Sequence, residues 1–118
     1  MKSTAAPTDT TWATSHPGLF LRANVLPVMN LSVSQAARDL RISRQTLNRI
    51  LEGSTTITPA MAVRLERLSG LPSMFWLCRQ CEYDLCTARA ALAEVLPQIP
   101  LKSLSPILLE QFGMPDGC

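Results

Sequence analysis

Four polar side chains on one short segment are of the types that read the edges of base pairs. In the segment 42–53, written ISRQTLNRILEG, these side chains are Arg44, Gln45, Thr46 and Asn48. Arginine pairs with guanine through two hydrogen bonds, glutamine and asparagine pair with adenine, and a threonine methyl can touch a thymine methyl. This mixture matches the donors and acceptors of the DNA major groove. We therefore predict that these four residues read bases.

The aliphatic side chains of the same segment predict a helix docked on a core. At about 100° per residue, Leu47, Ile50 and Leu51 share one face and the polar side chains point the other way. A polar helix face taken alone is more often an ordinary solvated surface. The prediction of DNA reading therefore depends on the elements around the segment.

Two short capped helices, separated by a tight turn, contain this segment. Ser32 followed three residues later by Gln35 fits a capping box at the start of one helix. Ser43 is placed to cap the next helix, which runs from residue 44 to about residue 51 and stops at Gly53. Two capped helices joined by so short a connection form a helix-turn-helix pattern.

A second set of residues lies where phosphate contacts are expected. Exposed N–H groups and the dipole at a helix N-terminus favour anions, and the planar guanidinium of arginine suits phosphate. Such contacts set the register in which neighbouring side chains read bases. We assign phosphate contacts to Ser32, Gln35, Arg41, Ser43 and Arg49.

The composition predicts one all-α domain. A chain of 118 residues can hold one compact domain with a hydrophobic core. Apolar residues make up 47% of the chain and aromatics only 5%, and the abundant Leu and Ala favour helices. The net charge of +2 is too small to indicate nucleic-acid binding by itself. Its distribution matters more, because Arg38, Arg41, Arg44 and Arg49 lie close together in the sequence.

Further helices are expected on both sides of the capped pair. One opens at His16-Pro17-Gly18 and buries Leu19, Phe20 and Leu26 before Pro27. Another begins at Thr58-Pro59, and a longer one follows Pro72-Ser73 and continues to about Leu96. The expected division is a disordered or partner-dependent arm at 1–15, a helix-turn-helix DNA-binding and dimerisation domain at 16–96, and a C-terminal tail with room for one helix at 97–118.

The cysteines offer a metal site as an alternative reading. Cys78, Cys81 and Cys86, in the run CRQCEYDLC, could ligate zinc with Cys118 or His16 as the fourth ligand. The first two lie inside a predicted helix without the turn that such pairs usually occupy, and the spacing alone is a weak signal. We therefore expect no metal and no cofactor.

The remaining aromatic and titratable residues favour structure over catalysis. We assign Phe75, Trp76, Tyr83 and Leu85 to the core or to a dimer interface, with Tyr83 at the dimer seam. His16 is the only histidine, and no group of candidate catalytic partners surrounds it in the sequence. We expect neither enzymatic activity nor a small-molecule substrate.

The pattern at the start of the chain and its hydropathy bear on location. Lys2 is followed by a stretch of Ser, Thr and Pro, and no apolar run approaches the ~20 residues of a membrane span. We expect a cytoplasmic, nucleoid-associated protein that does not contact a membrane.

Residues 16–85 resemble the HigA-type antitoxins, or antidote proteins, of bacterial toxin-antitoxin modules, a branch of the lambda-repressor-like (XRE-type) helix-turn-helix proteins. The distinctive motifs are HPG at 16–18, SRQTL at 43–47, ITPAMAVRL at 57–65, FWL at 75–77 and YDL at 83–85. The resemblance implies a five-helix DNA-binding domain, a homodimer on a palindromic double-stranded operator, repression of its own promoter, and binding of a HigB-type toxin that cleaves mRNA. The tail after about Leu96 lies outside the resemblance, and the spacing of its apolar residues predicts a C-terminal helical extension. A stand-alone regulator without a toxin and a protein-interaction adaptor remain alternatives.

Four residues depart from the pattern of the family. Leu19 stands where the family commonly has Glu, and Cys86 stands where an aromatic residue is common. Val33 stands where related repressors often place a phosphate-contacting Gln, and Arg41 stands where the turn commonly has Gly. If the turn needs a positive φ, Arg41 is strained; otherwise the turn must be built differently.

Overall fold

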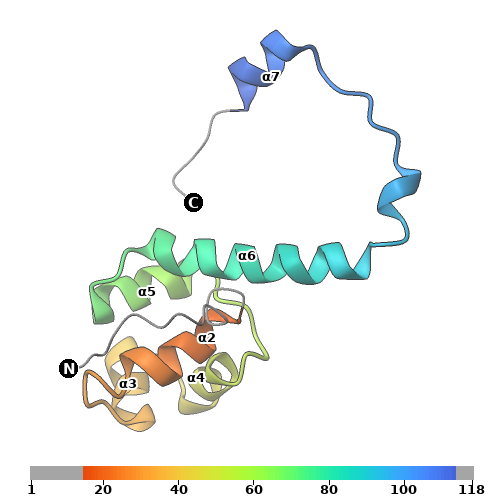
Figure 1. The fold of residues 1–118 in the computed structure, drawn as a ribbon. Coiled ribbons are helices and arrows are strands. Elements are labelled where there is room, and N and C mark those ends of the chain that lie inside the picture. The colour runs from red at the N-terminus through yellow and green to blue at the C-terminus, as the bar shows by residue number, and fades with distance from the viewer. Residues whose placement is uncertain (1–14, 114–118) are drawn as a thin grey trace, which may run out of the picture.

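All regular elements are helical in this computed structural model, which describes residues 15–113 (Figure 1). The all-α expectation is confirmed. The expected N-terminal arm lies outside the described residues except for Ser15. The elements are α2 (Pro17–Phe20), the π-helix η1 (Leu21–Val25), α3 (Val33–Leu40), α4 (Arg44–Leu51), α5 (Pro59–Ser69), α6 (Ser73–Ala91), the 3-10 turn η2 (Leu96–Gln98) and α7 (Pro106–Phe112).

Hydroxyl caps set the starts of α3, α4 and α5. The side chains of Ser32, Ser43 and Thr58 each accept a hydrogen bond from the amide three residues ahead, at 3.1, 3.0 and 3.2 Å. Each of these bonds satisfies one amide that has no partner within its helix. The helix starts expected from the sequence are therefore confirmed.

The first helix begins as expected, and Leu26 is buried and Phe20 half-buried, as predicted. His16 caps α2, since its Nδ1 accepts a hydrogen bond of 2.9 Å from the Gly18 amide. The wider π turn of η1 follows at once and changes the phase of the side chains. Leu21 and Val25 are buried as a result, whereas Leu19 is exposed, so the expected burial of Leu19 was wrong.

The core joins α2 and η1 to α3, α4, α5 and α6. Its fully buried side chains include Leu21, Leu47, Leu65 and Trp76. Gly18 lets α2 approach α4 closely, because a Cβ at this position would lie 1.7 Å from the carbonyl oxygen of Ile50. The HPG motif therefore helps to fix the position of α4.

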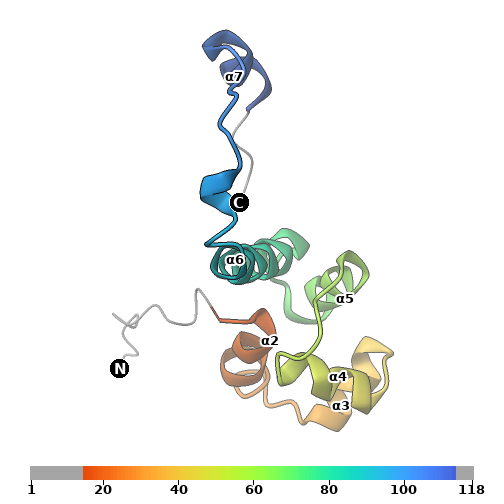
Figure 2. The ribbon, with the colours of Figure 1, turned by 90° about the vertical axis from the view of Figure 1, so that its right-hand side faces the viewer.

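The longest helix, α6, ends at Ala91, five residues before the expected end. Beyond Ala91 the chain tightens, because the Ala93 amide donates to the carbonyl of Ala90 and the Val95 amide donates to that of Leu92, each three residues back. Beyond α6 the chain leaves the helical domain, and α7 stands apart from the other helices in both views (Figures 1 and 2). Within residues 15–113, no helix is long and apolar enough to cross a membrane.

Candidate nucleic-acid interface

The turn between α3 and α4 is built on Arg41 in the left-handed conformation. Arg41 has φ 61° and ψ 41°. Its amide donates to the carbonyl of Arg38 at 3.1 Å, and the amide of Ile42 donates to the carbonyl of Ala37 at 3.0 Å. This closed turn needs a positive φ, which an L side chain adopts at a cost of about 1 kcal/mol. Of the two alternatives that the sequence left open, a strained Arg41 or a turn built differently, the structure has the strained Arg41.

An arginine from α5 supports this turn. The guanidinium of Arg64 donates to the carbonyl of Leu40 at 2.6 Å and lies 3.4 Å from the carbonyl oxygen of Arg41. Carbonyls at a helix C-terminus lack partners within the helix, and a cation there also interacts favourably with the helix dipole. Arg64 thus ties α5 to the turn that sets the angle between α3 and α4.

The buried side of α4 leaves the predicted base-reading side chains on the outer surface. Leu47, Ile50 and Leu51 are buried. The Ser43 hydroxyl donates to Thr46 Oγ1 at 2.8 Å. Because this bond occupies the hydroxyl of Thr46, its methyl group is the part of the side chain that can contact a thymine methyl. Among the predicted base-reading residues, the exposed ones are Arg44, Gln45 and Thr46, and the half-buried one is Asn48.

The residues predicted to contact phosphate differ in how available they are. Ser32 and Ser43 use their oxygens as caps, and both lie exposed at helix N-termini. Arg41 and Arg49 are exposed. Gln35 is engaged within α3, because its Nε2 donates to Asp39 at 2.7 Å and its Oε1 accepts from Arg38 at 2.7 Å. A phosphate contact by Gln35 would have to replace one of these bonds.

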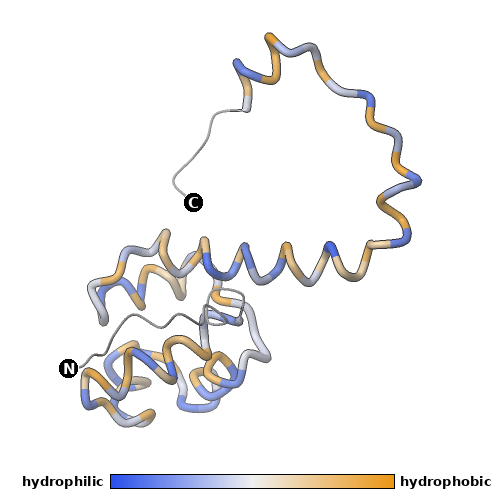
Figure 3. Tube along the Cα trace, viewed as in Figure 1, coloured by the Kyte–Doolittle hydropathy of each residue, from blue (hydrophilic) through white to orange (hydrophobic). Residues whose placement is uncertain are grey.

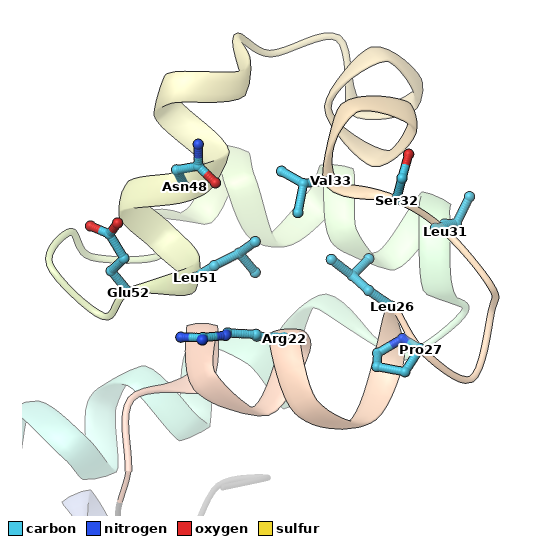
Figure 4. A pocket seen from close by; sticks show the side chains of 9 residues that line it. All are labelled: Arg22, Leu26, Pro27, Leu31, Ser32, Val33, Asn48, Leu51 and Glu52. Carbon is cyan, nitrogen blue, oxygen red and sulfur yellow. The ribbon is translucent and has the colours of Figure 1, made fainter.

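A groove of about 450 Å³ runs beside Asn48, between α4, η1 and the start of α3 (Figure 4). Val33 lies on its wall, at the position where related repressors often have Gln. The exposed Arg22 of η1 also lines this groove, and no pattern in the sequence singled it out. Arg22 adds a cation beside α4, whereas Glu52 on the same groove adds a negative charge.

The four residues assigned to the core or a dimer interface occupy different surroundings. Trp76 is fully buried and meets the rings of Phe20 and Phe75 in edge arrangements. Phe75 is half-buried beneath the Arg79 guanidinium, 5.0 Å from the ring centroid. Tyr83 packs against His16, with the ring centroids 5.3 Å apart. Leu85 is exposed.

Gln80 is a buried residue that sequence reasoning missed. Its Oε1 accepts from the Ile57 amide at 2.9 Å, and its Nε2 donates to Asp84 at 3.0 Å. The first bond fixes the loop before α5 onto α6. A glutamine inside a helical segment gives no signal of this role, because its partner lies 23 residues away.

His16 and the cysteines are the residues that the sequence offered for other chemistry. Burial lowers the pKa of His16, and the Thr55 backbone and the charge of Asp84 oppose this only in part. Among residues 15–113, no group of three or more His, Cys, Asp or Glu side chains is arranged to hold a metal ion. Cys81 and Cys86 are exposed thiols.

Comparison with known proteins places the chain among DNA-binding helix-turn-helix proteins. The sequence pattern of the Helix-turn-helix family matches residues 29–73. The structure of the Pseudomonas aeruginosa antitoxin HigA with the higBA promoter is 34% identical, with a TM-score of 0.71 over 77% of this chain and 99% of that one. A HigA-family addiction module antidote protein from Coxiella burnetii is 28% identical, with a TM-score of 0.70 over 76% and 98%.

The chain also has a curated sequence relative. Virulence-associated protein I of Dichelobacter nodosus is 35% identical over 88 residues, which cover 75% of this chain and 82% of that protein. The fold and the exposed face of α4 define a helix-turn-helix DNA-binding protein of the lambda-repressor-like type. Within that class, the chain belongs to the HigA-type antitoxin family.

Proposed function

We propose that this chain is the antitoxin of a toxin-antitoxin module, which represses its own operon as a homodimer and neutralises a HigB-type mRNA-cleaving toxin. The observation that carries the DNA-binding part is the geometry of α4. Three buried aliphatic side chains dock the helix and leave Arg44, Gln45 and Asn48 toward the outside. We expect the protein to act in the cytoplasm, at the nucleoid.

The proposed binding mode divides the surface into two roles. Arg44, Gln45, Thr46 and Asn48 read base edges in the major groove. Ser32, Arg41, Ser43 and Arg49 contact phosphates and set the register, and Gln35 joins them if it releases Asp39. The caps at the starts of α3 and α4 support this division, because they fix both N-termini.

The outer face of α6 supports the proposed homodimer. Met74, Cys81 and Ala88 follow one another at seven-residue intervals, as do Leu85 and Leu92, and all five are exposed. Such spacing forms one apolar stripe of the kind that packs helix against helix. We call these five residues the α6 stripe. It lies about 200° around the helix from the buried Trp76, so it faces away from the core. A homodimer that binds a palindromic operator has to present its two α4 helices to half-sites one DNA turn apart, about 34 Å.

The toxin part of the proposal draws its support from the family. The similar proteins of known structure include an antitoxin HigA and an antidote protein. The test is to co-express the chain with the product of the neighbouring reading frame. We expect a stable complex, relief of growth arrest, and repression of the shared promoter. Operator binding without any toxic neighbour would instead indicate a stand-alone regulator.

Salt dependence separates the proposal from a protein-interaction adaptor. Phosphate contacts release counterions, so operator affinity should fall steeply as salt rises. A gel-shift or anisotropy titration of the promoter fragment at several salt concentrations measures this slope. An absence of binding at low salt would overturn the DNA-binding part of the proposal.

A further inference from the structure

We propose that residues 93–113, here called the C-terminal arm, clasp a second copy of this chain by packing on its α6 stripe. The inference rests on the homodimer of the proposed function and assigns the surface that holds it together. It gives a role to the part of the chain for which the sequence offered none.

The C-terminal arm exposes an unusual amount of apolar surface. Every residue from 84 to 113 is exposed. Leu101 is 90%, Ile107 76% and Phe112 65% accessible. Figure 3 shows apolar residues recurring along the whole arm. A continuous apolar surface of this length is typical of a segment that another molecule covers.

The connection between α6 and α7 is extended. Pro97, Pro100 and Pro106 fix φ and disfavour helical conformations in the residues before them, so they extend the connection. No other helix of residues 15–113 packs along α7. Isolated helices shorter than about 12 residues are marginal in water, and α7 has only 7 residues. The helix therefore needs an external surface.

The position of the arm indicates which surface that is. The arm leaves the end of α6 and curves over the side opposite α2 and α4 (Figures 1 and 2). The α6 stripe points to this side, because Met74 and Leu85 lie about 200° around the helix from Trp76 and Tyr83 respectively. Leu92 is the last residue of the stripe, and the arm follows it directly. The arm and the stripe therefore lie on the same side of α6, where the arm of a second copy can reach the stripe.

The charge of the arm favours a second copy over a strongly charged partner. Its charged residues are Glu94, Lys102 and Glu110, a net charge of −1. An arm that bound a basic protein or a nucleic acid would carry many charges of the sign opposite to that of its partner. An apolar, weakly charged arm instead complements an equally apolar stripe, which a second copy supplies by two-fold symmetry.

The available area is sufficient for a stable dimer. Nine large apolar side chains of the arm are exposed, on average by about half. At the usual area per side chain, their burial removes roughly 400 Å² per copy. The total surface buried by two arms and the two stripes that they cover then exceeds the approximately 1,000 Å² that a specific interface needs.

The decisive experiment is a triple substitution in the full chain, Leu101→Ser, Ile107→Ser and Phe112→Ser. These side chains contact no core, so the domain should keep its helix content and melting temperature. We expect the native chain to be a dimer and the variant to dissociate at least ~10-fold more readily in sedimentation equilibrium. Val28→Ser, at a position 82% exposed between η1 and α3, is the control and should leave the dimer unchanged.

Two measurements keep the outcome clear. Isotope-filtered NOEs between labelled and unlabelled copies should connect the arm of one copy to Leu85 of the other. A monomeric native chain, or a triple variant that dimerises like the native chain, would overturn the inference. Loss of toxin binding in the variant would not rescue it, because toxin binding belongs to the proposed function and not to the dimer contact. Binding to a DNA half-site tests base reading separately, since it needs only one α4.

Discussion

The guanidinium of Arg64 donates a hydrogen bond of 2.6 Å to the carbonyl of Leu40, the last residue of α3. This bond crosses 24 residues of sequence and ends beside Arg41, which holds a positive φ. A side chain of α5 thus stabilises the turn that a glycine would form without strain. We expect Arg64→Met to lower the free energy of unfolding by about 1–2 kcal/mol, measured by urea denaturation.

Arg41→Gly should separate stability from DNA binding. Glycine relieves the left-handed strain, so we expect the free energy of unfolding to rise by about 0.5–1 kcal/mol. The lost guanidinium should weaken binding to all DNA sequences alike and reduce the salt slope by about 1. Arg38→Gly, inside α3, is the matched control and should destabilise by about 1 kcal/mol. A loss of stability in Arg41→Gly would contradict the strain argument.

Substitutions on α4 should divide into two classes. We expect Arg44→Ala and Asn48→Ala each to cost about 1–3 kcal/mol of operator binding and to relax the preference at one base pair. Arg49→Ala should weaken binding uniformly across sequences. Anisotropy titrations with the operator and with single-base variants measure both effects. Arg89→Ala, an exposed arginine at the far end of α6, should leave binding unchanged. Unaltered specificity in both α4 variants would count against base reading.

Gly18→Ala tests the close approach of α2 to α4. The new methyl would lie 1.7 Å from the carbonyl oxygen of Ile50, so one helix must move. We expect a loss of at least about 2–3 kcal/mol in the free energy of unfolding, as for other overpacked sites. Gly70→Asn is the control, since a Cβ there meets open space and asparagine tolerates a positive φ. Equal melting temperatures for Gly18→Ala and the native protein would refute the predicted clash.

His16 should make stability depend on pH. Burial lowers its pKa in the folded state, so the folded protein holds the neutral imidazole. The full stability is then present above the unfolded pKa of about 6.5 and is lost as the pH falls from there through the folded pKa. Thermal melts between about pH 5 and pH 8 should show this decline. His16→Asn keeps an acceptor for the Gly18 amide and should flatten the profile in this range; an unchanged profile would assign the decline to other groups.

Local chemistry made much of the fold predictable. The caps at Ser32, Ser43 and Thr58 act on amides three residues away, so the sequence alone locates the starts of three helices. The spacing of Leu47, Ile50 and Leu51 likewise identifies the buried side of α4, and with it the outward position of the predicted base-reading residues. Such features depend on side chains within one or two helical turns, which a sequence displays directly.

Only the tertiary structure decided the features that depend on distant partners. Arg41 could have kept an ordinary turn, and its positive φ became clear only with the closed turn and the support from Arg64. The π turn that exposes Leu19, the bond from Ile57 to Gln80 and the direction of the C-terminal arm likewise arise from packing between separate segments. The sequence determined which residues can form helices and which face of α4 is polar. The arrangement of those helices followed from contacts between residues far apart in the chain, which no local pattern encodes.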